Sequence, residues 1–317
     1  MKVLVTGGAG YIGVVLCEQL INAGIDVRDV PAAAFEGIDA VAHLAGLSND
    51  PTAEYNPKAN WEMNATATQE LARACKKHGV KRLTFGSSAS IYDGLGDDIF
   101  DETAAVSPRG AYSRSKHAAE DALLLEAGKD FSPVILRQGT VYGYSSRMRL
   151  DLVVNTFIKD ALLRGALYLH GGGWMYRPLV DITDVAEAHL RCLEAPADAV
   201  GGQIFNVVHD NFQIRQLAML VTGSLSLIGR HARLENAPVP KINRNYRCSN
   251  RKLHDRIGFQ PSVTVLESIE KILSNLPVDD PTLLAHPRYY NIAWMTLLDE
   301  ILGEHDGFAS VWETARR

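Results

Sequence analysis

The sequence contains no run of about 18 apolar residues, which is the minimum for a membrane-spanning helix. Its formal net charge of −5 over 317 residues lacks the excess of positive charge that is typical of proteins that bind nucleic acid or anionic membranes. The N-terminus, MKVLVTGG, begins a predicted strand at once and shows no apolar signal segment. We therefore expect a cytoplasmic protein with neither a nucleic acid nor a membrane as its partner.

Cysteine is also scarce. The four cysteines, Cys17, Cys75, Cys192 and Cys248, lie far apart and form no CxxC pair. Disulfide frameworks and zinc sites generally need more or closer cysteines, so we expect free thiols in a reducing compartment and no metal site.

The remaining composition is that of a globular protein, with 46% hydrophobic residues and a length that allows one large or two modest domains. Strand-like and helix-like patterns alternate along the first part of the chain. We predict strands at 2–6, 39–45, 82–87, 133–136, 166–170 and 203–208, and helices at 11–22, 62–77, 112–127, 150–164, 185–194 and near 294–302. Asp184 and Glu187 are expected to open the helix at 185–194 as a capping box. This alternation predicts an α/β fold with a doubly wound parallel sheet.

A glycine-rich turn lies between the first predicted strand and the first predicted helix. Gly7, Gly10 and Gly13 follow a G-x-x-G-x-x-G spacing. Glycine allows the tight turn and lets the backbone approach a pyrophosphate, which the positive end of the helix attracts. A glycine triplet alone is also typical of a structural turn, but the flanking strand and helix favour a dinucleotide site that includes Tyr11 and Ile12.

Tyr112 and Lys116 lie four residues apart on a predicted helix, so their side chains share a face. A nearby cation favours the phenolate form of tyrosine and lowers its pKa, which would allow Tyr112 to act as a base on an alcohol. Ser88 follows the strand at 82–87, at the sheet edge where ligands of α/β folds bind. Either feature alone is typical of a solvated helix face or a turn. Together with the glycine turn they favour hydride-transfer chemistry.

These motifs resemble the extended short-chain dehydrogenase/reductase family, and most of all its branch of nucleotide-sugar epimerases and dehydratases. The resemblance covers about residues 1–275 and rests on motifs that fall in the family's order: residues 6–13, 43–46, Asn64, 88–92, Tyr112 with Lys116, and 137–143. It implies a Rossmann-like sheet, NAD as cofactor, and a nucleotide-sugar substrate that passes through a transient keto intermediate.

The resemblance also implies roles for particular residues. Ser88, Tyr112 and Lys116 would be catalytic, with Tyr112 as the base. The cofactor would be bound by Gly7, Gly10, Tyr11, Ile12, Gly13, Asp29, Leu44, Ala45, Gly46, Tyr112 and Lys116. The substrate would be bound by Ser88, Ser90, Tyr112, Thr140, Arg177 and Arg247, with Arg177 at the diphosphate. Arg147, Arg149 and Asn155 would flank the substrate side. For Arg247 and these three flanking residues, a structural role at the surface fits the sequence equally well.

The relatives that are dehydratases carry an Asp-Glu pair after the catalytic hydroxyl, and this chain has Ala89 and Ser90 there. Elimination of water needs an acid and a base at adjacent carbons, so the sequence favours an epimerase over a dehydratase. A net NAD(P)-dependent oxidoreductase is the main alternative. A non-catalytic dinucleotide-binding protein is disfavoured because the chain keeps both Tyr112 and Lys116.

The segment that should hold the adenosine end of the cofactor is short. Only 16 residues, 23–38, separate the helix at 11–22 from the strand at 39–45, so we predict that the usual second strand, its helix and its loop are missing, with 25–30 beside the first strand. Asp29, or Asp26 with Val27, would be the remaining adenosine contacts. A carboxylate near the ribose favours NAD over NADP, while Arg28 leaves this choice open.

Two further expectations concern organisation. Residues 1–140, with about 178–205, would form the Rossmann-like NAD-binding domain, and residues 141–177 with 206–317 a smaller α/β substrate-binding domain. The resemblance also implies a homodimer in which the helices at 62–77 and 112–127 form a four-helix bundle, although their small apolar residues would equally suit an ordinary core.

Overall fold

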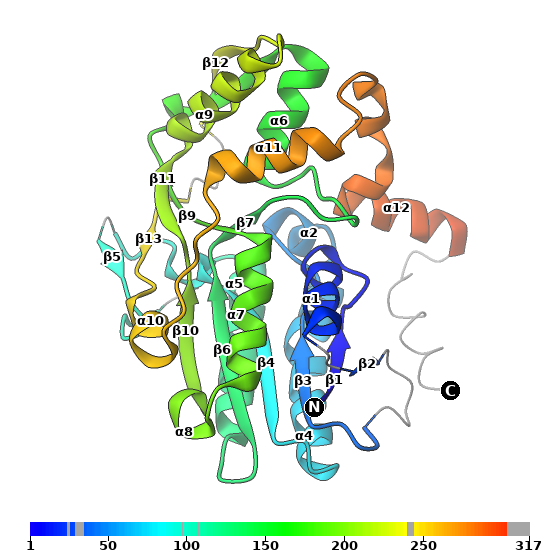
Figure 1. The fold of residues 1–317 in the computed structure, drawn as a ribbon, viewed down its shortest axis with the longest axis vertical. Coiled ribbons are helices and arrows are strands. Elements are labelled where there is room, and N and C mark those ends of the chain that lie inside the picture. Colours follow the sequence, from blue (N-terminus) through cyan, green and yellow to red (C-terminus); the bar gives the residue numbers. More distant parts are fainter. Residues whose placement is uncertain (24–25, 29–34, 97, 107, 240–243, 303–317) are drawn as a thin grey trace.

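The computed structural model describes residues 1–23, 26–28, 35–96, 98–106, 108–239 and 244–302. Its centre is a six-stranded parallel sheet with helices on both faces (Figure 1). The strands lie in the spatial order β10 (Gln203–Val207), β6 (Ser132–Gln138), β4 (Arg82–Ser88), β3 (Ala40–His43), β1 (Lys2–Thr6) and β2 (Asp26–Arg28). This arrangement confirms the predicted fold class, and every strand predicted in this sheet is present with small shifts at its ends.

Both faces of the sheet are apolar, as a parallel sheet between two helical layers requires. In β1, Val3 and Val5 point into one buried cluster, which also contains Leu16 of α1 (Tyr11–Asn22) and Leu190 of α7 (Ile182–Glu194). Leu4 points to the opposite cluster, formed with α4 (Ala67–Lys77) and α5 (Ala111–Glu126). The alternation of side chains along the strand therefore supplies both layers.

A second group of elements packs at the carboxyl ends of the sheet strands. It contains the sheet β11 (Asp210–Gln213), β9 (Tyr176–Asp181) and β7 (Thr140–Tyr142), and the pair β8 (Ala166–His170) and β12 (Arg233–Ala237). Its helices are α6 (Val153–Arg164), α9 (Ile214–Leu227) and α11 (Val265–Asn275), which share one apolar cluster. In Figure 1 this group lies above the large sheet.

Smaller elements complete the described chain. They are α2 (Asp50–Tyr55), α3 (Pro57–Trp61), a π-helical turn (Glu62–Thr66), β5 (Ile99–Phe100) paired with β13 (Arg247–Cys248), α8 (Ala197–Val200), α10 (Arg251–Ile257) and α12 (Asn291–Leu302). Short 3₁₀ segments lie at Ala89–Tyr92, Gly171–Gly173, Pro281–Ala285 and Pro287–Tyr289. The predicted helix at 62–77 is thus interrupted, because its first turn is π-helical.

The shortened N-terminal segment has a clear structural form. β2 has three residues and pairs in parallel with β1, with Lys2 opposite Asp26, while β3 occupies the other side of β1. Between these two strands, the described residues 35–39 form a turn and no helix. Asp29 lies outside the described residues, so its predicted contact with the cofactor stays a prediction.

One predicted helix start is wrong. α7 begins at Ile182, and its cap is Asp181, whose side chain accepts a hydrogen bond from the backbone N–H of Thr183. Asp184 lies inside the helix, and its carboxylate accepts hydrogen bonds from the backbone N–H groups of Ser262 and Val263 instead. The predicted capping box therefore fails because Asp184 is used by a tertiary contact.

Candidate active site

The glycine turn is tightly closed on itself. The backbone N–H of Gly10 donates to the carbonyl oxygen of Gly7 at 2.8 Å, and Gly7 has a φ of 79°. A Cβ atom on Gly13 would lie 2.0 Å from the carbonyl oxygen of Gly7, so the helix can pack against the turn only with glycine at this position. The start of α1 is thereby brought close to the end of β1, which is the arrangement that offers backbone N–H groups to phosphate.

The side chain of Tyr11 serves a different purpose from the neighbouring glycines. It is buried, and its hydroxyl donates to the carbonyl oxygen of Gly143 at 2.6 Å and accepts from Asn155 Nδ2 at 3.1 Å. Tyr11 therefore joins the turn to the second group of elements, and only its backbone faces the turn. Asn155 is fully buried in these contacts, and its predicted place on the substrate side stays a prediction.

The loop after β3 forms the second wall of the candidate cofactor site. Leu44 N–H donates to the carbonyl oxygen of Thr6 at 3.0 Å, which aligns this loop with the glycine turn. At Gly46, which has a φ of 147°, a Cβ atom would lie 2.2 Å from Asn64 Oδ1 and 3.7 Å from Lys116 Nζ. The three predicted loop residues, Leu44, Ala45 and Gly46, thus lie between the glycine turn and Lys116.

Asn64 supports this wall from the π-helical turn, a type of distortion that is frequent at functional sites. Its Nδ2 donates to the carbonyl oxygen of Leu47 at 2.9 Å and to Asn60 Oδ1 at 2.8 Å. Its Oδ1 is buried and has no hydrogen-bond partner among the described residues. An unpaired acceptor beside a glycine-lined cradle fits a polar ligand such as the ribose and amide groups of a dinucleotide.

The three predicted catalytic side chains come together at the end of β4. Tyr112 lies close enough to Ser88 for the Ser88 side chain to lower the pKa of Tyr112, and Lys116 Nζ donates to the carbonyl oxygen of Gly86 at 2.9 Å. Ser88 is held in turn by Ser90, whose hydroxyl lies 2.9 Å from Ser88 Oγ and whose backbone N–H donates to it at 3.2 Å. Ser90 is buried beside Ser88, so its contact in this structure is with Ser88.

Burial dominates the electrostatics of this group. Desolvation raises the pKa of Tyr112 to about 12, and the interaction with Ser88 and the charge of Arg149 act in the opposite direction. Desolvation lowers the pKa of Lys116 to about 8, against the charge of Glu120. The sequence led us to expect Lys116 to lower the pKa of Tyr112. In the structure the cation that acts on Tyr112 is Arg149, because the ammonium group of Lys116 is directed at Gly86.

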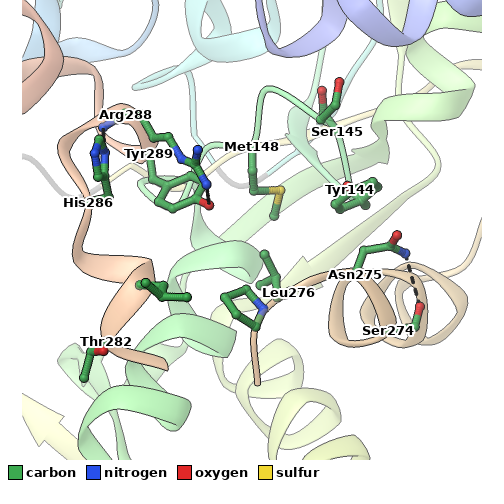
Figure 2. A pocket seen from close by; sticks show the side chains of 13 residues that line it. Tyr144, Ser145, Met148, Ser274, Asn275, Leu276, Thr282, His286, Arg288 and Tyr289 are labelled. Atoms are coloured by element: carbon green, nitrogen blue, oxygen red, sulfur yellow. Dashed lines mark hydrogen bonds between the residues drawn. The ribbon is translucent and has the colours of Figure 1, made fainter. Parts of the chain in front are cut away.

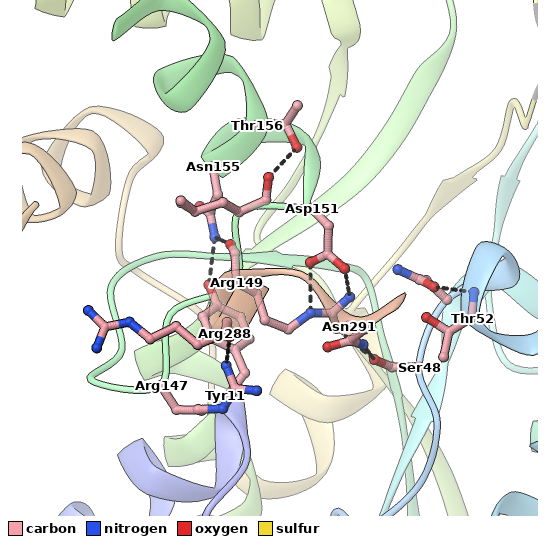
Figure 3. A network of polar contacts seen from close by, with 12 residues as sticks. Tyr11, Ser48, Thr52, Arg147, Arg149, Asp151, Asn155, Thr156, Arg288 and Asn291 are labelled. Carbon is pink, nitrogen blue, oxygen red and sulfur yellow. Dashed lines mark hydrogen bonds and ion pairs between the residues drawn. The ribbon is translucent and has the colours of Figure 1, made fainter. Parts of the chain in front are cut away.

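Arg149 is fixed by contacts to two segments (Figure 3). Its Nε and Nη2 donate to the two carboxylate oxygens of Asp151 at 2.9 Å each, and its Nη1 donates to Ser48 Oγ at 2.6 Å. Asn291 at the start of α12 also donates to Ser48 Oγ, at 3.2 Å. The loop 44–50, the segment after β7 and the C-terminal helix therefore meet at Ser48, beside Tyr112.

Arg177 lies in β9 on the other side of the candidate substrate site. It is half-buried; its Nη1 donates to the carbonyl oxygens of Tyr176, at 2.9 Å, and Arg244, and its guanidinium lies 5.8 Å from the ring centroid of Tyr246. Burial lowers the pKa of Arg177. Arg244 forms an ion pair with Asp50 at the start of α2, which connects Arg177 to the loop 44–50.

A cavity of about 830 Å³ opens beside Arg177. Its wall combines apolar side chains, such as Phe157 and Ile214, with polar ones, such as Asp151 and His170. This size and this mixture suit a small polar ligand. Because Asp151 also pairs with Arg149, the cavity and the Tyr112 region are connected through one ion pair.

The remaining predicted substrate residues are less central. Arg247 lies in β13 with its guanidinium 4.9 Å from the ring centroid of Tyr176, next to Arg177 in β9. Thr140 is partly buried at the start of β7, opposite Leu179. Arg244 and Asp50 were not among the predicted residues, because a pair so far apart in the chain leaves no local pattern.

A second cavity, of about 800 Å³, lies apart from Tyr112 (Figure 2). It is enclosed by the loop at Tyr144 and Met148, the end of α11 at Asn275, and the C-terminal segment at His286 and Tyr289. Tyr144 thus lines this cavity. None of the predicted site residues does so.

Two other features bear on the sequence predictions. The four cysteines are free thiols, and the described part of the chain holds no group of three or more His, Cys, Asp or Glu residues arranged for a metal ion. Across the described ranges, no helix is both long and apolar enough to cross a membrane.

Comparison with known proteins identifies the family. Residues 3–207 match the model of the NAD dependent epimerase/dehydratase family. A UDP-glucose 4-epimerase of Corynebacterium glutamicum is 26% identical over 313 residues, which cover 85% of this chain and 93% of that protein. An uncharacterized UDP-glucose epimerase of Bacillus subtilis is 29% identical over 237 residues, which cover 62% of this chain and 73% of that protein.

The fold agrees with solved structures of the same kind. The Thermus thermophilus UDP-glucose 4-epimerase in complex with NAD superposes with a TM-score of 0.75 at 26% identity, covering 87% of this chain and all of that one. MoeE5 in complex with UDP-glucuronic acid and NAD superposes with a TM-score of 0.77 at 25% identity, covering 87% of this chain. The chain therefore belongs to the NAD-dependent epimerase/dehydratase family, which confirms the family and the NAD cofactor predicted from the sequence.

Proposed function

We propose that this protein is an NAD-dependent epimerase that acts on a nucleotide sugar through a transient keto intermediate. The observation that carries the proposal is the meeting of Ser88, Tyr112 and Lys116 at the end of β4, with Arg149 connecting this region through Asp151 to the cavity at Arg177. The glycine turn and the loop 44–46 would hold NAD, which would supply a hydride acceptor for the sugar and the hydride donor for the opposite face of the keto carbon.

In this proposal Tyr112 removes the proton from the sugar hydroxyl and later returns it. A pKa of about 12 keeps Tyr112 protonated at neutral pH, so the proton can leave only when positive charge lies close by. This pKa already includes the charge of Arg149, so further positive charge is needed, and Lys116 lies on the same face of α5. Ser88 hydrogen-bonds the reacting oxygen and orients it toward Tyr112.

The substrate side is proposed to bind a nucleoside diphosphate. The guanidinium group of Arg177 suits paired phosphate oxygens, and Arg247 lies close to it. The adjoining cavity of about 830 Å³, with Tyr168 and Phe157 in its wall, is large enough for a nucleoside. Several relatives bear names that refer to UDP-glucose, which makes UDP-hexoses the first substrates to test.

The experiment is incubation of the purified protein with NAD and a panel of UDP-, dTDP- and GDP-hexoses, with products separated by chromatography. We expect one substrate to give its epimer, and the Tyr112→Phe variant to give none while still binding the sugar nucleotide. If no sugar nucleotide is bound or converted, the proposed substrate class is wrong.

A net oxidoreductase is the second candidate. It is favoured by a relative, the GDP-6-deoxy-D-mannose reductase of Pseudomonas aeruginosa, which is 28% identical over 251 residues. Steady consumption of added NADH or NADPH would support it. A dehydratase is disfavoured because no carboxylate follows Ser88: Ala89 is fully buried and Ser90 is bonded to Ser88.

We also propose the domain division at 1–140 with 178–205, and a homodimer through α4 and α5. Some small apolar residues of these helices, such as Ala72 and Ala119, lie in the core. Ala118 and Ala122 are partly exposed, and Leu125 is 84% exposed, which supports an interface on this face of α5. A mass near that of one 34.7 kDa chain at micromolar concentration would contradict the dimer.

A further inference from the structure

Three consecutive residues of β4 contact three residues spaced four apart on α5. The carbonyl oxygen of Gly86 accepts from Lys116 Nζ at 2.9 Å, and Ser88 interacts with Tyr112. Between them, Ser87 Oγ donates to Glu120 Oε1 at 2.5 Å. Tyr112, Lys116 and Glu120 share one face of α5, so Glu120 extends the catalytic set by one further helical turn.

Glu120 is a buried charge with a buried partner. The carboxylate accepts from Arg137 Nη2 of β6 at 2.7 Å and from Arg137 Nε at 3.1 Å and 3.2 Å. The side chain of Glu120 is 2% exposed and that of Arg137 is 4% exposed. Burying two charges has a large desolvation cost, and an apolar pair of similar volume would avoid that cost. Apolar side chains would therefore pack α5 against the sheet at a lower cost. We expect the charge of Glu120 to serve a further role.

The same pair fixes the residues on the far side of Ser88. Arg137 Nη1 donates to the hydroxyl of Tyr92 at 2.8 Å, and that hydroxyl donates to Asn206 Oδ1 of β10 at 2.9 Å. Ser87 is thus held to α5 before Ser88, and Tyr92 is held to β6 and β10 after it. Both ends of the short segment that presents Ser88 depend on the Glu120–Arg137 pair.

We propose that Glu120 is a positioning residue for the Ser88–Tyr112–Lys116 set: it aligns α5 with the end of β4 through Ser87, and its carboxylate, one helical turn from Lys116, is the counter-charge of that ammonium group. The proposal rests on the proposed function, because it concerns the same site. The effects that it predicts are on the ionisation of Lys116 and on the position of Ser88. A protonated Lys116 is needed to bond a ribose as a donor.

The groups that face Lys116 in the described structure leave Glu120 as its counter-charge. Tyr112 and Glu120 face it from its own helix. From β3 comes His43, whose pKa is lowered to about 3 by burial and by Lys116, so it is neutral at pH 7. From β4 comes the ring of Phe85, with its centroid 4.7 Å from Nζ, and from β6 Arg137 reaches the group through Glu120. The charge of Glu120 raises the pKa of Lys116 and so opposes the effect of desolvation.

A purely structural ion pair would behave differently from a positioning residue. Loss of a structural pair lowers the free energy of unfolding and leaves the ionisation of Lys116 unchanged in the molecules that remain folded. Loss of the proposed role lowers the pKa of Lys116 in the folded protein. The pKa of Lys116 is therefore the deciding quantity, and it can be measured with no substrate.

The experiment is a ¹³C NMR titration of lysine side chains in the full chain, with the Lys116 signal assigned by its loss in Lys116→Met. In Glu120→Gln we expect the pKa of Lys116 to fall by at least about one unit, since removal of a nearby opposite charge has this effect. Glu126→Gln is the matched control. It removes a carboxylate from the same helix, where Glu126 pairs with Lys76 at the surface, and should leave Lys116 unchanged.

Ser87→Ala tests the alignment separately and is the milder variant if Glu120→Gln does not fold. It keeps the charge of Glu120 and removes its contact with β4. We expect an unchanged pKa of Lys116 and a kcat about tenfold lower at saturating sugar nucleotide, because small misplacement of reacting groups costs rate. An unchanged Lys116 pKa in folded Glu120→Gln would overturn the charge role, and an unchanged kcat in Ser87→Ala would overturn the alignment role. Failure to find a sugar-nucleotide substrate would leave the NMR result intact and would count against the proposed function alone.

Discussion

Lys116 Nζ lies 2.9 Å from the carbonyl oxygen of Gly86, and this contact directs the ammonium group at β4. Lys116 and Tyr112 share one face of α5, but Lys116 contacts Gly86 of β4, whereas Tyr112 lies near Ser88. In this structure Arg149 is the cation that acts on Tyr112, whose pKa stays near 12. Under the proposed mechanism, Tyr112 loses its proton only when further positive charge enters the site. The oxidised nicotinamide ring would supply such a charge.

Tyr112→Phe tests the role of the phenol. The substitution removes one hydroxyl and keeps the ring, so the fold and the binding of NAD should persist. We expect kcat to fall by about 10²–10⁴, the usual contribution of a general acid–base group. Activity is measured by product formation from the sugar nucleotide, and bound NAD is measured in the same samples. Full activity in the variant would rule Tyr112 out as the base.

Lys116→Met tests the cost of burying the ammonium group. The pKa of Lys116 is about 8 in the folded protein and about 10.5 in the unfolded chain, because burial disfavours the charged form. Below pH 8 both states are protonated and the full cost is present. Between pH 8 and 10.5 the unfolded chain binds more protons, so the stability of the wild type rises with pH in that window.

We therefore expect the ligand-free Lys116→Met protein to be more stable than the wild type at pH 7, by about 2 kcal/mol after the lost bond to Gly86 is allowed for. The advantage should shrink between pH 8 and 10.5. Urea unfolding at a series of pH values measures it. If the variant is less stable than the wild type at every pH, burial of the Lys116 ammonium group does not destabilise the folded protein.

Gly13→Ala tests the packing of the phosphate turn. A Cβ atom would lie 2.0 Å from the carbonyl oxygen of Gly7, which is backbone and cannot rotate away. We expect the affinity for NAD to fall at least about tenfold and the melting temperature to drop, because the helix must move off the turn.

The matched control is Gly223→Ala in α9, where a Cβ atom would have no neighbour within 4 Å. This change should raise the free energy of unfolding by about 0.5–1 kcal/mol through helix propensity and leave NAD binding unchanged. Calorimetric titration with NAD and thermal unfolding test both variants. Tight NAD binding by Gly13→Ala would contradict the assignment of the turn.

Arg177→Ala tests the proposed diphosphate contact. Loss of a charge-assisted fork should weaken the binding of UDP by about 10–100-fold and raise KM with a smaller change in kcat, since the phosphates do not react. Arg191→Ala, which removes a surface arginine paired with Glu187, is the control and should bind UDP as the wild type does. Equal UDP affinity in all three proteins would place the nucleotide elsewhere.

Much of the fold could be predicted from the sequence because its signals are local. The bounds of β1 and α1 agree with the prediction to the residue, since the glycine turn separates a β-rich run from a helical pattern. The short connection after α1 likewise follows from counting residues. The start of α7 was mispredicted, because Asp184 bonds to backbone groups of Ser262 and Val263, and such a contact leaves no trace in a window of sequence.

The same distinction applies to the candidate site. Tyr112, Lys116 and the glycines were found because each belongs to a spaced motif. Arg149 was named only as one of several flanking residues, and its action on Tyr112 depends on how the segment after β7 folds back onto Ser48. The ion pair of Asp50 with Arg244 likewise exists only in the folded chain. Side chains that act across elements are beyond local patterns.

The most direct test of the account is to follow, in one sample, the configuration of the sugar by NMR and the absorbance of the reduced nicotinamide while the protein converts its sugar nucleotide. The account predicts that the epimer accumulates over many turnovers with no net change in reduced coenzyme, because the hydride that leaves the sugar returns to it. Formation or consumption of reduced coenzyme in proportion to product would contradict an epimerase and identify a net oxidoreductase.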